Sequence, residues 1–129
     1  MHEQLKRLLA PYVGVTLSAF DNLKLVVSVL SAEVSANHSS EEPPELKPVA
    51  YEAQRKSDVG LEVFYCVKWQ GVWIDCGRIN DYAASPALLS CEEESEIEMS
   101  SLRELNVPVM TMQQVSFMCM ESAHFDHCE

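Results

Sequence analysis

Five cysteines and four histidines are the side chains of this sequence best suited to specialised chemistry. The densest group is His124-Phe125-Asp126-His127-Cys128, with Cys119 a few residues before it. Imidazole and thiolate groups are good ligands for zinc or copper. The spacing is not that of a known zinc finger, however, and the ends of chains usually fray. We therefore expect neither a metal site nor a bound cofactor.

The thiols are poor candidates for nucleophiles. A catalytic cysteine needs a lowered pKa, usually supplied by a nearby base or a helix N-terminus. Cys91 instead precedes a run of glutamates, and Cys76 follows Asp75, so both have negative neighbours. Cys66 and Cys119 lie in apolar runs, where small buried thiols are the usual finding. Phosphate-loop, HExxH and GxSxG motifs are also missing, so we expect no catalytic residues and favour a binding protein over an enzyme.

Aromatic and acidic side chains suggest two kinds of binding site. Trp69 and Trp73 are candidate anchors for a protein partner if one face of a predicted hairpin is uncovered. The opposing interpretation is that a helix covers that face and places these aromatic residues in the core. The alternative site is an apolar pocket between sheet and helix, which would serve a small-molecule-binding domain or a small enzyme. Its residues would be Tyr51, Tyr65, Trp73 and Asp75.

Charge is the most informative bulk property of the sequence. Twenty acidic and nine basic residues give a net charge of −11, and the only base after residue 79 is Arg103. Such a field repels nucleic acids and anionic membranes, and it attracts basic proteins. Solubility alone would also explain it. The acidic residues that we expect to steer a partner are Glu92, Glu93, Glu94, Glu96 and Glu98.

The expected compartment is the cytoplasm. An odd number of cysteines without a visible export signal favours free thiols and a reducing environment. The longest apolar stretch, residues 23–30, is far shorter than the roughly 20 residues of a membrane-spanning helix. With 129 residues, the chain is expected to form a single domain that needs no metal or disulfide to fold.

The first half of the chain begins with a predicted helix. Residues 3–13 form an amphipathic pattern whose last turn is disturbed by Pro11. Residues 15–20 and 23–30 alternate and favour a hairpin, although a helix beginning at Asp21 also fits. Residues 35–48 are polar and contain prolines, so we expect a mobile loop there.

The second half contains the clearest pattern, a β-hairpin over residues 61–79 that turns at Gln70-Gly71. A strand over residues 49–53 precedes it. After residue 80, Ser85-Pro86 and the capping-box pattern over residues 101–104 predict one or two helices. The tail over residues 107–120 alternates like a strand, and a helix from Thr111 is nearly as plausible.

These elements predict an α+β fold in which the N-terminal helix packs on an antiparallel sheet of about four to six strands. The favoured hypothesis for function is a non-catalytic acidic protein-binding module, such as an inhibitor or immunity-type protein that masks a basic partner. A homodimer formed through a sheet edge or the methionine-rich tail is a further alternative.

Overall fold

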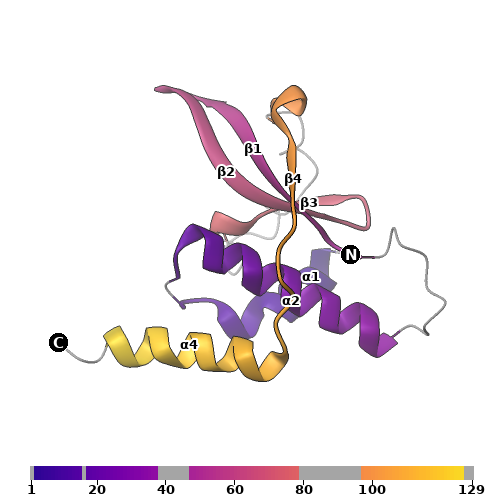
Figure 1. Ribbon diagram of the computed structural model, residues 1–129, viewed down its shortest axis with the longest axis vertical. Helices are drawn as coiled ribbons and strands as arrows, with labels where there is room; N and C mark the ends of the chain where they lie inside the picture. The colour runs from indigo at the N-terminus through magenta and orange to yellow at the C-terminus, as the bar shows by residue number, and fades with distance from the viewer. Residues whose placement is uncertain (1, 16, 38–46, 79–96, 127–129) are drawn as a thin grey trace.

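The computed structural model describes residues 2–15, 17–37, 47–78 and 97–126 of the chain (Figure 1). The predicted α+β fold is confirmed: an N-terminal helix, a four-stranded antiparallel sheet and a further helix after residue 80 are all present. In chain order the elements are α1 (His2–Leu9), the 3₁₀ turn η1 (Ala10–Tyr12), α2 (Ala19–Asn37), β1 (Val49–Ser57), β2 (Gly60–Trp69), β3 (Val72–Asp75), the 3₁₀ turns η3 (Cys76–Arg78) and η6 (Met99–Ser101), β4 (Arg103–Leu105) and α4 (Met112–Asp126).

The sheet has the strand order β3-β2-β1-β4, so β1 and β2 are the two central strands. The pairing of β1 with β2 runs the full length of β1, from Val49 opposite Lys68 to Ser57 opposite Gly60. Both outer strands are shorter, with four residues in β3 and three in β4. The far end of the β1–β2 hairpin therefore extends beyond its neighbours (Figure 1).

The predicted hairpin over residues 61–79 is present as β2 and β3, and it turns at Gln70-Gly71 as expected. Gln70 and Gly71 both have positive φ, 52° and 80°, which is the backbone of a type I′ turn. The returning strand is shorter than predicted: it ends at Asp75, and the chain continues as the 3₁₀ turn η3. The Oδ1 atom of Asp75 accepts a hydrogen bond from the Gly77 backbone N–H at 2.9 Å, which fixes this change of direction.

The predicted hairpin over residues 15–30 is wrong, because most of this segment forms α2. The β-branched residues favour strands locally, but Val26, Leu30 and Val34 are buried on one face of the helix. Tertiary packing thus overrides local propensity. Ser18 begins the helix by accepting a hydrogen bond from the Asp21 backbone N–H at 3.2 Å. The helix continues to Asn37, so the predicted loop over residues 35–48 is wrong at its start; residues 38–46 lie outside the described residues.

The N-terminal helix is confirmed, and its irregular end is as expected. α1 ends at Leu9 and continues as the 3₁₀ turn that contains Pro11. Leu5 and Leu9 are fully buried against the core.

Two predictions after residue 80 need correction. The capping-box pattern over residues 101–104 does not begin a helix, since Ser101 ends η6 and Arg103 begins β4. The Ser101 hydroxyl instead accepts from the Gln54 N–H at 2.9 Å and donates to the Glu98 carbonyl at 2.6 Å, so it joins this turn to β1. The predicted helix start at Ser85-Pro86 lies outside the described residues.

The tail is a helix rather than a strand. The Thr111 hydroxyl accepts a hydrogen bond from the Gln114 N–H, and the Gln114 side chain accepts one from the Thr111 N–H. This reciprocal capping box begins α4.

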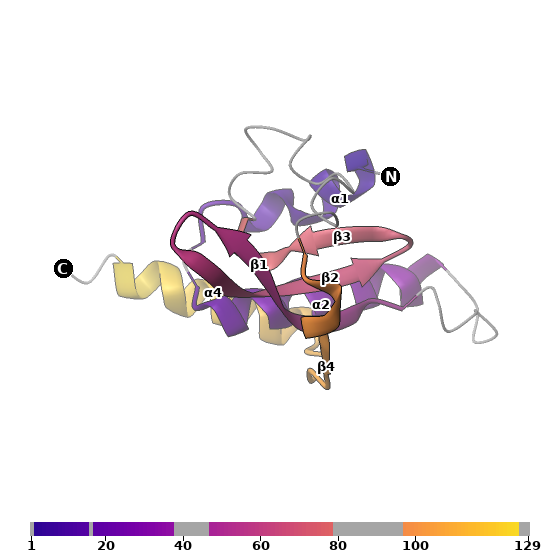
Figure 2. The ribbon, with the colours of Figure 1, turned by 90° about the horizontal axis from the view of Figure 1, so that it is seen from above.

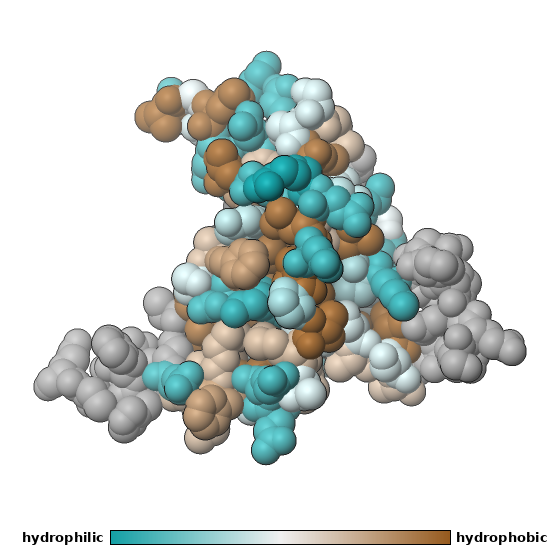
Figure 3. Space-filling view, in the orientation of Figure 1, coloured by the Kyte–Doolittle hydropathy of each residue, from teal (hydrophilic) through white to brown (hydrophobic). Residues whose placement is uncertain are grey.

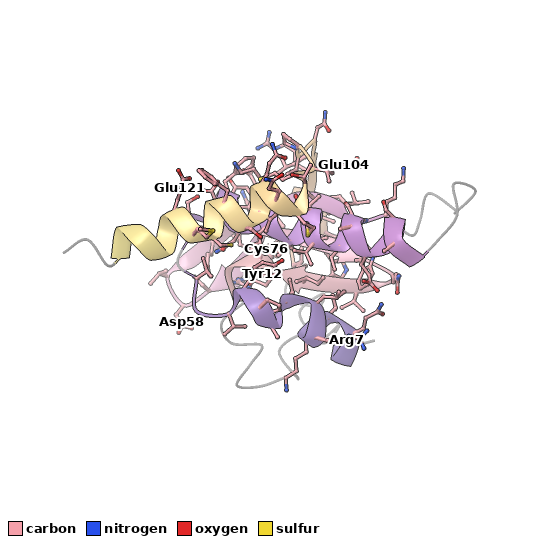
Figure 4. All side chains as sticks on the ribbon, turned by 90° about the horizontal axis from the view of Figure 1, so that it is seen from below. Arg7, Tyr12, Asp58, Cys76, Glu104 and Glu121 are labelled. Carbon is pink, nitrogen blue, oxygen red and sulfur yellow. The ribbon has the colours of Figure 1, made fainter. Side chains whose placement is uncertain are left out.

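The three α-helices in the described residues lie on the same side of the sheet (Figure 1). α2 packs directly on the strands, and α1 and α4 flank it (Figure 2). The main core lies between α2 and the sheet and includes Leu23, Leu30, Val67 and Ile74. Seen from the helical side, Tyr12 and Cys76 lie near its middle, whereas Arg7, Asp58, Glu104 and Glu121 lie toward its edges (Figure 4).

A smaller cluster of buried residues occupies the opposite face of the sheet. It contains Ala53, Cys66, Trp73 and Ile97. The sheet therefore has apolar packing on both faces near its centre, which determines where the aromatic side chains lie.

Candidate protein-binding surface

Both tryptophans are buried, so neither is the exposed anchor that the sequence suggested. Trp69 is 1% exposed and belongs to the core beneath the helices, while Trp73 is 2% exposed on the opposite face. Side chains alternate between the two faces of a sheet, so Trp69 on β2 and Trp73 on β3 point to opposite faces. The expectation of an uncovered face fails because both faces are packed at this position.

Only one of the five predicted steering glutamates lies in the described part of the chain. Glu98 is partly exposed, and its carboxylate lies 3.8 Å from the Lys56 ammonium. Glu92, Glu93, Glu94 and Glu96 lie outside the described residues. All nine basic residues but only eleven of the twenty acidic ones lie in the described ranges, so nearly all of the net charge belongs to the remaining residues.

The predicted small-molecule pocket is only partly assembled. Tyr51, Trp73 and Asp75 share the sheet face opposite the helices, and the rings of Tyr51 and Trp73 are 5.4 Å apart. Tyr65 lies on the helical face, where its ring meets Phe20 edge to face at 5.8 Å. The sheet thus lies between Tyr65 and the other three residues.

A buried ion pair joins β1 to β3 across β2. The Arg55 guanidinium lies 2.6 Å from the Asp75 carboxylate and 3.5 Å from that of Glu62, and it stacks over the Phe64 ring at 4.3 Å. Burial lowers the pKa of Arg55, but the hydrogen bond and charge of Asp75, followed by those of Glu62, outweigh it and raise that pKa. Arg55 therefore stays charged, and the pair is suited to holding the strands together.

Cys66 is buried as the sequence predicts, whereas Cys119, for which the sequence also predicts a buried thiol, is only partly buried because it lies on α4 at the edge of the core. Burial, followed by the charge of Asp75, raises the pKa of Cys66 to about 12. Burial also raises the pKa of Cys76, with smaller contributions from Cys66 and Asp75, and burial alone raises that of Cys119. A thiol with a raised pKa holds little thiolate near neutral pH and is a weak nucleophile.

An apolar surface that is not predictable from the sequence lies on the far end of the β1–β2 hairpin. We call residues 56–63 the arm, and its exposed apolar residues the arm surface: Val59, Leu61 and Val63, which are 97%, 61% and 58% exposed. Hydrophobic residues appear among hydrophilic ones at the tip of the molecule (Figure 3). Sequence alternation places Leu61 and Val63 on the helical face, but it does not show that the strand extends past the helix.

The arm surface continues toward the body of the molecule. Tyr65 follows Val63 on the same face of β2, and it contacts Phe20, which is itself 41% exposed at the start of α2. Exposed apolar residues that adjoin one another in this way mark interaction sites more often than isolated ones do.

A hollow of about 250 Å³ lies beside the arm, where β3 has ended. Its lining comes from β1, β2, the end of β3, the turn η3 and the first residue of α2: Arg55, Glu62, Val63, Phe64, Tyr65, Asp75, Gly77 and Ala19. Both polar and apolar groups face it. The hollow exists because the turn at Asp75 directs the chain away from the edge of β2.

A second set of exposed apolar residues lies on α4. Phe117 and Met120 are exposed, whereas Val115 alone is fully buried on this helix among the residues whose exposure is described. A hollow of about 460 Å³ separates Phe117 from Lys24 of α2. In its described part the helix contacts the core through Val115, Met118 and Cys119 and presents Phe117 and Met120 outward.

Neither a metal centre nor a membrane span is found in the described ranges. In residues 2–15, 17–37, 47–78 and 97–126, no three His, Cys, Asp or Glu side chains are grouped to hold a metal ion. The side chains of the C-terminal His/Cys cluster lie outside the described ones. In the same ranges, no helix combines the length and hydropathy needed to cross a membrane.

Comparison with models of protein families, with curated proteins and with solved structures finds no match to this chain. Its function must therefore be inferred from its own residues. Packing within the described residues explains neither the exposed apolar residues of the arm nor those of α4, and only the arm combines them with an unpaired strand edge.

Proposed function

We propose that this chain is a non-catalytic protein-binding module that covers a basic surface of a partner, as an inhibitor or immunity-type protein does. The observation that carries the proposal is the arm surface. Val59, Leu61 and Val63 project from a paired hairpin rather than from a loose loop. A hairpin of this kind presents its side chains in fixed directions.

The energetics favour a contact at this surface. Fully burying a valine or leucine side chain contributes about 1.5–3 kcal/mol. β-Branched side chains also have few rotamers to lose when they become ordered. The two valines and one leucine of the arm surface would supply a useful share of a specific interface, which is usually dominated by a few residues.

The charge of the chain favours a basic partner. A net charge of −11 attracts positively charged proteins over several ångströms and raises their association rate. The proposed binding therefore separates into electrostatic attraction at long range and apolar contact at the arm.

Small-molecule binding is a second candidate, favoured by the hollow beside the arm. Arg55, Asp75 and Phe64 would supply ionic and apolar contacts to a ligand. Its volume of about 250 Å³ lies just below the roughly 300–1,000 Å³ of typical ligand pockets. Arg55 and Asp75 already pair with each other, so the protein-binding role remains the favoured one.

The test is affinity capture from the source cell with the purified full chain as bait. We expect the wild-type chain to retain a basic protein that mass spectrometry identifies and that Leu61→Ser loses. Val109→Ser is the matched control, because Val109 is 60% exposed and lies outside the arm. Both substitutions remove one exposed apolar side chain, so Val109→Ser controls for a general loss of exposed apolar surface.

Two results would contradict the proposal. One is capture of the same proteins in the same amounts by the wild-type chain and Leu61→Ser. The other is equal loss with Leu61→Ser and Val109→Ser, because the effect would then not belong to the arm.

A further inference from the structure

The outer edge of β2 has no neighbouring strand along the arm among the described residues. β3 pairs with residues 66–69 of β2 and ends at Asp75, so residues 60–64 lie beyond it. On the other side these residues pair with β1. A strand edge of this kind presents backbone donors and acceptors to which another strand can bind.

The β2–β3 turn determines which backbone groups face that edge. Trp69 and Val72 flank the two-residue type I′ turn, so their backbones are hydrogen-bonded to each other. Hydrogen-bonding direction alternates along an antiparallel strand. Residues 61, 63 and 65 therefore direct their N–H and C=O groups to the same side as Trp69, away from β1.

The hollow beside the arm follows this edge. Val63 and Tyr65 line it from one face of β2, and Glu62 and Phe64 line it from the other. An added strand would therefore have two different environments for its alternating side chains. One is the apolar arm surface, and the other contains the half-exposed Glu62 carboxylate together with Asp75 and Arg55, in which two carboxylates face one guanidinium.

Charge decides between the possible occupants of the edge. A second copy of this chain would bring two molecules of net charge −11 together, which is electrostatically unfavourable. A basic segment would instead be attracted to the molecule, and its cations would lie beside Glu62. The best fit is an extended segment that alternates apolar and basic residues.

We propose that the edge of β2 at Leu61 and Val63 binds an extended basic segment of a protein partner by strand addition. The apolar side chains of that segment cover the arm surface, and its basic side chains lie beside Glu62. This inference rests on the proposed function, because it states how the same partner is held.

The probe is a fluorescent octapeptide that alternates lysine and valine, titrated with the full-length chain and followed by anisotropy. We expect saturable binding. The control peptide has the same sequence with every backbone amide N-methylated. This change preserves the charge and the side chains but removes all backbone N–H donors. Strand addition requires those donors, so the control should bind about tenfold more weakly or worse.

A protein variant tests the same edge. Val63→Pro removes the N–H that faces outward, without removing a bond to β1, and should weaken binding of the unmodified peptide about tenfold. Val63→Thr keeps the N–H and the β-propensity and should change binding by no more than about threefold. Circular dichroism shows whether Val63→Pro is folded, and the methylated peptide tests the proposal independently of that variant.

Three outcomes would overturn strand addition: no saturable binding of the unmodified peptide, equal binding of the methylated one, or full binding by folded Val63→Pro. If capture of a partner still depends on Leu61, the protein-binding function survives and only the mode of binding is wrong. Sedimentation of the chain alone should show a monomer. A dimer that Val63→Pro abolishes would assign the edge to a second copy instead.

Discussion

Cys66 lies opposite Asp75 on the sheet face that the helices do not cover, and this position determines its chemistry. Sequence alone places this thiol in an apolar run and predicts that it is buried and inert. It does not reveal the neighbouring carboxylate, because Asp75 reaches Cys66 through strand pairing. Alternation likewise assigns Trp69 and Phe64 to opposite faces correctly, yet it does not show that Trp73 is covered.

The raised pKa of Cys66 predicts alkaline destabilisation. Below pH 9 the thiol is protonated in both the folded and the unfolded chain, so its full contribution to stability is present. Between pH 9 and about 12 the unfolded chain loses this proton while the folded chain keeps it. The free energy of unfolding should therefore fall by about 1.4 kcal/mol per pH unit from this group alone.

Urea denaturation between pH 8 and 10.5 measures this effect, with Cys66→Ala as the comparison. Cys76, Cys119 and Tyr12 also have raised pKa values, add slopes of the same sign and are present in both proteins; losing Cys66 also lowers the pKa of Cys76, which makes the slope of the variant shallower still. The variant should thus show the shallower slope whatever its stability at pH 8. Identical slopes would mean that Cys66 titrates normally in the folded protein.

Among the secondary-structure elements, α2 shows why local patterns misled the prediction. Its valines and leucines fit a strand pair by alternation and by β-propensity. They form a helix because a helix brings Leu23, Val26 and Leu30 onto one face over the sheet. By contrast, β2 and its turn at Gln70-Gly71 are predictable, since pattern, propensity and turn residues agree there.

Ser28 is the polar residue that joins α2 to the chain leading into α4. It is fully buried, and its hydroxyl accepts a hydrogen bond from the Met110 backbone N–H at 2.8 Å. Ser28→Ala should lower the free energy of unfolding by about 1–3 kcal/mol, because the Met110 N–H loses its acceptor.

Ser31→Ala provides the control for this prediction. Ser31 lies one turn later on the same helix and is only partly buried, so the change in helix propensity is the same. Chemical denaturation of the two variants isolates the hydrogen bond. Equal stabilities would show that the contact contributes nothing measurable.

For the whole molecule, charge and apolar surface are expected to act on different rate constants. The acidic surplus lies largely outside the described residues, whereas the arm surface lies within them. Long-range attraction affects association, and close apolar contact affects dissociation. The long-range attraction is predictable from the sequence, because net charge can be counted without a structure. The apolar contact is not, because it depends on how far β2 extends beyond α2.

This separation can be measured with the lysine-valine octapeptide by stopped-flow fluorescence. Raising the salt from about 0.02 M to 0.5 M should slow association of the peptide at least several-fold, since the Debye length falls from about 20 Å to about 4 Å. Leu61→Ser should mainly speed dissociation. Association that is insensitive to salt would remove the electrostatic part of the proposed function.

The ion pair between Arg55 and Asp75 has a consequence for this balance of rates. It connects the first strand of the arm to β3 at the point where β3 ends, while the strand between them supplies Phe64 beneath the guanidinium. The ion pair thus connects β1, β2 and β3 at the point where the arm extends beyond β3. A partner would meet a preorganised surface there and lose less conformational entropy on binding than it would with an unsupported hairpin.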